Sequence, residues 1–180
     1  MRFLSDAESR QWVAERQVSI DDRGRPAAYS ANHHHLQFQL PASIGQFTAL
    51  CRFLGSCLEP RASCLLWITE WGVWPSAENW HLYYRLRESH GDRRLLNEAP
   101  GHLLLIYEEA ELVSFVEIGL LAGWDIHLIP HLTYGDTDTA RVFISHDGWI
   151  ILSHREESTV ATWRTELQQR KYRLLSIPTG

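Results

Sequence analysis

The segment 102–129 most constrains the fold, because strand, helix and strand patterns follow one another in it without a break. Residues 102–107 form a short apolar run of strand length. Apolar residues then recur at helical spacing from Leu112 to Ala122, and Gly123 suits the left-handed residue that commonly ends a helix. Residues 124–129 follow as a second strand. A strand–helix–strand succession is typical of a right-handed parallel crossover, so we predict a parallel pair of strands here.

The predicted helix in this segment carries carboxylates in its first turn, at Glu108, Glu109 and Glu111. The helix dipole favours negative charge at that end. Farther along, apolar residues lie on nearly all of its sides, with Phe115 near the middle. A helix of this kind is usually buried, so we expect it to pack inside the protein.

Weaker signals predict elements on both sides of this segment. Ser5 stands three residues before Glu8, the spacing of a capping box, and starts a short helix. Asp147-Gly148 between two apolar runs indicates a hairpin of residues 141–145 and 149–153. Residues 79–88 fit a helix and a strand about equally well, and both alternatives stay open. Further helices are predicted within 43–58 and around 160–167, and further strands at 18–22, 36–40, 64–71 and 172–177.

These patterns predict an α+β (mixed α/β) fold in which residues 1–180 form a single compact domain. We expect a central mixed sheet with about four helices, one parallel strand–helix–strand unit and a C-terminal hairpin. The first residues lack the pattern of a signal peptide, and no charge-free run of 18 apolar residues occurs. We therefore expect a soluble cytoplasmic protein that does not span a membrane.

Negative charge is concentrated in one part of the chain. The net charge is −5, yet no Lys or Arg lies between Arg94 and Arg141. Eight carboxylates in that interval give it a charge of −8, at Glu98, Glu108, Glu109, Glu111, Glu117, Asp125, Asp136 and Asp138. Such a segment repels nucleic acid and attracts a basic protein surface. The alternative is a solvated helix start followed by a polar loop.

Histidines and one aspartate form the candidate site. Asp125 and His127 share one face of a strand, and His131 follows near its end. His127 or His131 would serve as a general base with Asp125 as its orienting carboxylate. With His146 in the hairpin turn and His154 after it, His127 and His131 would alternatively bind a divalent metal ion. The alternative is that these are surface or hydrogen-bonded imidazoles, because none of the spacings is specific.

Other chemistry-bearing residues are better explained as structural. Cys51, Cys57 and Cys64 lack zinc-site spacing, and we expect buried, reduced thiols. The run His33-His34-His35 is too short to indicate a metal tract. Arginines at 85, 87, 93 and 94 near aromatic residues resemble a single-stranded nucleic-acid surface, but acidic residues interrupt it. Eight tryptophans should mostly fill the core, with some exposed as interface anchors.

The sequence carries no G-x-S-x-G, Walker-type or G-x-G-x-x-G signature. We therefore predict a non-catalytic binding protein without a cofactor, which uses its acidic surface. The alternative is a metal-assisted or general-base hydrolase with a His/Asp site around residues 125–131.

Overall fold

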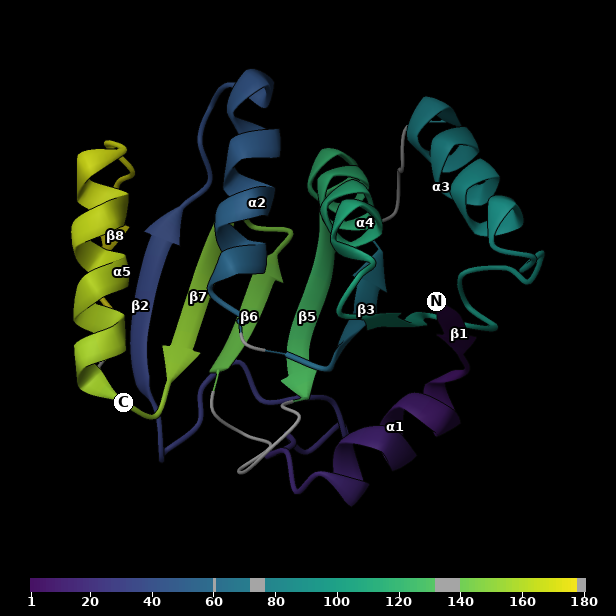
Figure 1. The fold of residues 1–180 in the computed structure, drawn as a ribbon, viewed down its shortest axis with the longest axis horizontal. Coiled ribbons are helices and arrows are strands. Elements are labelled where there is room, and N and C mark those ends of the chain that lie inside the picture. The colour runs from purple at the N-terminus through teal and green to yellow at the C-terminus, as the bar shows by residue number, and fades with distance from the viewer. Residues whose placement is uncertain (60, 72–76, 132–139, 178–180) are drawn as a thin grey trace.

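Eight strands form one sheet, in the order β1-β4-β3-β5-β6-β7-β2-β8, and every described pairing is antiparallel (Figure 1). The computed structural model describes residues 1–59, 61–71, 77–131 and 140–177, with the backbone alone at 77–79. The strands are β1 (Arg2–Leu4), β2 (His34–Gln39), β3 (Ser63–Trp71), β4 (Gly101–Leu105), β5 (Trp124–His131), β6 (Ala140–Ser145), β7 (Trp149–His154) and β8 (Leu174–Leu175).

Helices cover the two faces of this sheet unequally (Figure 1). Four of them pack on one face, and α1 packs on the other through Trp12 and Val13 against Leu65 and Trp67 of β3. The helices are α1 (Asp6–Glu15), α2 (Phe47–Ser56), α3 (Ala77–Ser89), α4 (Glu109–Ala122) and α5 (Glu157–Gln169), with a short 3₁₀ helix η1 (Ile44–Gln46) before α2. Residues 79–88, for which the sequence left helix and strand open, are therefore helical, and the described residues form five α-helices instead of the expected four or so.

The predicted parallel pair is wrong, although its strands and helix exist. β4 and β5 each pair antiparallel with β3, which lies between them. They therefore run in the same direction without being neighbours, and α4 crosses over β3 to connect them. The sheet is consequently not mixed among the described strands. The strand–helix–strand pattern indicates the relative direction of two strands, but it carries no information about a third strand from earlier in the chain.

The predicted hairpin is confirmed. β6 and β7 pair in antiparallel register from Ala140 opposite His154 to Ser145 opposite Trp149. Gly148 in the turn has φ 82°, a backbone conformation that favours glycine. Two weaker predictions are only partly met, because 18–22 contributes just a single bridge at Ile20 and the last strand shortens to β8.

Helix α4 is buried on one side only. Leu112, Phe115, Val116 and Leu120 face the core, while Leu121 on the outer side is 36% exposed. The expectation of a helix buried all round is therefore wrong. Gly119 explains the close approach to the sheet, since a Cβ at this position would lie 2.2 Å from Ile126 Cδ1 of β5.

Replacing Phe115 with Ala should lower the free energy of unfolding by about 3–5 kcal/mol. The ring is 1% exposed and lies 4.8 Å from the His102 ring and 5.9 Å from the Tyr83 ring between centroids. Its removal leaves a cavity that these neighbours cannot fill. A denaturant titration measures the change, with Leu121→Ala as the control from the outer side of α4. A loss below about 1 kcal/mol for Phe115→Ala would contradict this packing.

The three cysteines are free and buried, as expected from the sequence. Burial raises the pKa of Cys51 and of Cys64 to about 12, and it also raises that of Cys57. The native protein should therefore not react with dithionitrobenzoate near neutral pH, whereas the unfolded protein should show three reactive thiols. Rapid modification of any thiol in native buffer would contradict this burial.

Candidate functional site

Asp125, at the start of β5, is the centre of a polar cluster beside the β6–β7 turn. The backbone N–H of His146 donates to Asp125 Oδ1 at 2.7 Å, and the His146 ring Nδ1 lies 2.8 Å from the same oxygen. Asp125 is 8% exposed, while the His146 side chain is half exposed. The turn therefore covers the carboxylate and leaves the imidazole open to solvent.

Glu70 joins this cluster through a β-bulge in β3. Ile68 lies opposite Ile126 and Glu70 lies opposite Asp125, so β3 has one extra residue, Thr69, at this point. Without the extra residue, Glu70 would lie opposite Trp124, whose side chain points into the core. The bulge instead places Glu70 on the same face as Asp125. One ligand atom each from Glu70, Asp125 and His146 lie within 4.8 Å of one another.

Carboxylates surround His146. The hydrogen bond to Asp125, and then its charge, raise the pKa of His146, with further contributions from the charges of Asp147 and Glu70. Asp147 Oδ1 lies 3.4 Å from His146 Nε2. The cluster therefore favours a positive charge at the imidazole position.

His146 should titrate above its ordinary pKa of 6.5 in an NMR pH titration. Replacing Asp125 with Asn should lower the His146 pKa, because the main cause of the shift is lost. Since the folded-state pKa is raised, the stability contributed by this pair is complete below the ordinary pKa and is lost as pH rises through the raised value. Equal pKa values in the two proteins would contradict the contact. His127 is an internal comparison, because burial lowers its pKa to about 3.

The other predicted site residues lie apart from this cluster. His127 is 6% exposed, and its ring centroid lies 4.6 Å from that of Phe143. His131, at the other end of β5, packs edge-on against Trp12 with centroids 6.4 Å apart. Four residues along one strand separate His127 and His131 by about 13 Å. Among the described residues, neither belongs to a group of three potential metal ligands.

His154 and the histidine run have structural contacts. His154 Nδ1 accepts the backbone N–H of Glu156 at 2.9 Å, at the entry to α5. His154 lies at the end of β7 remote from the turn, roughly 16 Å along the strand from Trp149. Both ring nitrogens of His35 are engaged, with Ser153 Oγ at 2.8 Å and the carbonyl of Ser30 at 2.9 Å. Of the four predicted metal-binding histidines, only His146 therefore belongs to the cluster at Asp125.

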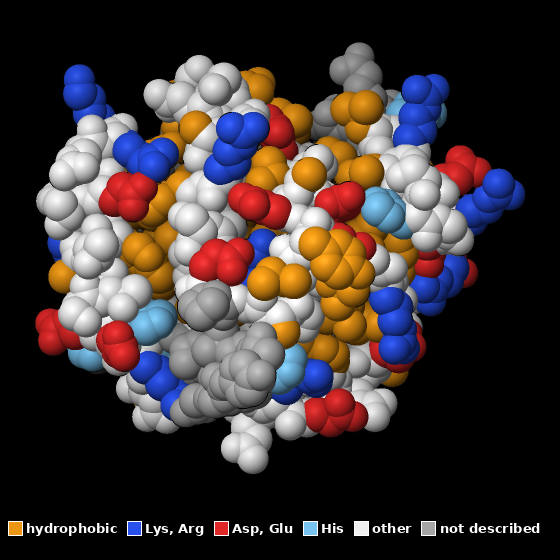
Figure 2. Space-filling view, viewed as in Figure 1, with side chains coloured by type: hydrophobic (Ala, Val, Ile, Leu, Met, Phe, Trp, Pro, Cys, Tyr) orange, Lys and Arg blue, Asp and Glu red, His pale blue; other side chains and the backbone are white. Residues whose placement is uncertain are grey.

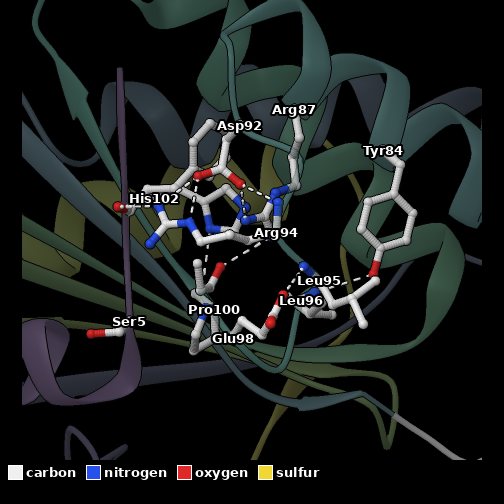
Figure 3. A network of polar contacts seen from close by, with 12 residues as sticks. Ser5, Tyr84, Arg87, Asp92, Arg94, Leu95, Leu96, Glu98, Pro100 and His102 are labelled. Carbon is white, nitrogen blue, oxygen red and sulfur yellow. Dashed lines mark hydrogen bonds and ion pairs between the residues drawn. The ribbon is translucent and has the colours of Figure 1, made fainter.

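A second polar network is buried between α3 and β4 (Figure 3). Arg87 is completely buried, pairs with Asp92 at 2.8 Å, and donates to the hydroxyl of Tyr83 at 2.7 Å. Tyr83 Oη lies 3.0 Å from His102 Nε2, and His102 Nδ1 lies 3.1 Å from the carbonyl of Pro100. A neutral imidazole that donates through Nδ1 and accepts through Nε2 satisfies this chain. Burial, followed by the charge of Arg87, accordingly lowers the pKa of His102 to about 3.

Ion pairs involve three of the four arginines that resembled a nucleic-acid surface, and two of these arginines belong to this network. Arg94 also pairs with Asp92, and Arg93 pairs with Glu88 at 2.9 Å. Tyr83 is buried, so its ring is not available for stacking with a base. That nucleic acid is not a partner stays a prediction.

A surface of different character lies around the start of α4. Leu105, Ile106 and Tyr107 are 38%, 53% and 76% exposed, and exposed Glu109 follows them at the start of α4. Figure 2 shows acidic and apolar side chains together over α2 and α4. A groove of about 630 Å³ lies here, lined by Thr48, Arg52, Glu109, Val113, Ser114 and Glu117. We call Leu105–Tyr107 together with Glu109, Glu111 and Glu117 the acidic α4 surface.

Sequence reasoning missed Glu70, because no local signal marks the bulge that turns it toward Asp125.

No described helix is long and apolar enough to cross a membrane. Comparison of the chain with protein-family models, with curated proteins and with solved structures finds no match.

Proposed function

We propose that this protein is a non-catalytic binding protein that captures a basic partner through the acidic α4 surface. The observation that carries the proposal is the exposed apolar run Leu105–Tyr107 directly ahead of the carboxylates of α4. The partner would present Lys or Arg side chains around a small apolar contact.

The apolar part of this surface supports a contact with another macromolecule. Large apolar side chains that are exposed near one another often mark an interaction site. Tyr107 is the most exposed of the three, and Tyr is enriched among residues that dominate binding energy. It would be the anchor of the contact.

The acidic part is smaller than the sequence indicated, because several carboxylates have partners within the protein. Glu108 is buried and pairs with the N-terminal amine, and Asp125 is held by His146. Glu98 accepts the backbone N–H of Leu95. Asp136 and Asp138 lie outside the described residues. The acidic α4 surface therefore depends on Glu109, Glu111 and Glu117.

These three carboxylates belong to one helix and reinforce one another. Glu109 and Glu111 lie in the first turn of α4, where the helix dipole stabilises them, and Arg52 of α2 lines the same groove as Glu109. Glu117 accepts a hydrogen bond from Thr48 at 2.7 Å, which holds it at the groove between α2 and α4. Their shared field would attract a basic partner and weaken as salt rises.

The alternative of a metal-assisted or general-base hydrolase has less support. His127 is buried, and His131 lies at the far end of the same strand. In open parallel sheets, ligands collect at the carboxyl ends of the strands, which would favour a site near the end of β5. That rule does not apply here, because every described strand pairing is antiparallel. This alternative would depend on a cation at Glu70, Asp125 and His146.

Replacing Glu109 with Lys and Tyr107 with Ala together should abolish partner capture, because the double variant removes the anchor and reverses a nearby charge. Affinity purification from lysate at low and high salt, followed by mass spectrometry, measures this loss. Wild-type protein should retain a basic partner at low salt and release it at high salt.

The matched control is Glu157→Lys, which makes the same charge reversal at the first residue of α5. It should retain the partner at low salt, because α5 lies outside the acidic α4 surface. Capture that survives in the Tyr107/Glu109 variant, or no partner at low salt, would count against the proposal.

A further inference from the structure

We propose that Glu70, Asp125 and His146 bind a divalent transition-metal ion, such as Zn²⁺ or Mn²⁺. The site lies beside the β6–β7 turn, on the face of the sheet opposite α4. Either proposal can therefore fail without the other.

The strongest argument is a pair of like charges that the fold places opposite each other. Glu70 and Asp125 are cross-strand partners in β3 and β5. Like charges directly opposite in a sheet are destabilising. The β-bulge at Thr69 creates this pair, and bulges often re-aim a side chain beside a functional site. A bound cation would turn the repulsion into shared coordination.

The contacts of Asp125 leave it able to bind an ion. Both hydrogen bonds from His146 end on Oδ1. Oδ2 makes no hydrogen bond with a described residue, so it offers lone pairs to a ligand.

The donor set selects the kind of cation. Two carboxylates and one imidazole form a mixed oxygen and nitrogen set, which favours Zn²⁺ or Mn²⁺ over Mg²⁺, a cation that prefers oxygen ligands and water. Bonds of about 2.1 Å need ligand atoms within about 4.2 Å of one another. The observed limit of 4.8 Å is close to this, and exposed Glu70 can close the remainder by side-chain rotation. Three protein ligands leave a coordination position for water.

The test is isothermal titration of untagged, chelator-treated protein with ZnCl₂, MnCl₂ and MgCl₂, beside thermal melting with and without each ion. We expect one saturable site for Zn²⁺ or Mn²⁺ and weaker binding of Mg²⁺. Glu70→Gln and His146→Ala should each weaken binding at least about tenfold, since even partners of metal ligands have effects of that size. The matched controls are Glu157→Gln and His81→Ala, which alter an exposed carboxylate and an exposed imidazole elsewhere.

Melting of the metal-free protein distinguishes a ligand from a structural residue. Glu70→Gln should leave its melting temperature unchanged or raise it, because one of two opposed charges is removed, and should abolish the increase caused by the metal. Absence of saturable binding to the wild type would overturn the proposal. Binding of unchanged affinity in Glu70→Gln would also overturn it, because the ion would then lie elsewhere, for example at the histidine run 33–35.

Discussion

The position of β3 between β4 and β5 is the constraint on which the rest of the structure depends. Its first seven residues are buried, which requires neighbours on both edges and cover on both faces. Cys64, Leu66 and Ile68 face the helices, whereas Leu65 and Trp67 face α1. α4 must then cross over β3 to reach β5, and the bulge at the end of β3 sets the direction of Glu70. One strand thus determines the topology and one side of the candidate metal site.

Local features of the fold could be predicted from the sequence, because each depends on neighbouring residues. The Ser5 and Glu8 capping box, the left-handed Gly123 after α4 and the Asp147-Gly148 turn all occur as expected. Features that depend on distant residues could not be predicted. The pairing of β4 with β3 is one example. The apolar run of β3, residues 64–68, is compatible with several positions in a sheet, so the sequence does not show which strand lies beside it.

The candidate site also combines residues that the sequence indicates with contacts that it does not reveal. Asp125 and His146 were both singled out from the sequence, but their contact joins β5 to the turn between β6 and β7. His127 and His131 were grouped because they are close in sequence, yet an extended strand separates residues that a helix would bring together. Glu70 was missed because a one-residue bulge, which the sequence does not reveal, decides which face it occupies.

The two polar networks differ in a way that separates structure from function. Arg87, Tyr83 and His102 are fully buried and form a chain of hydrogen bonds from donor to acceptor. The positive charge of Arg87 is paired with Asp92. Such a network holds α3 to β4 and has little access for a ligand. At Asp125 the balance is different, because Glu70, Asp125 and Asp147 surround one imidazole that is open to solvent. A proton on His146 offsets only one of the three carboxylates. The remaining negative charge would favour a cation at the proposed site.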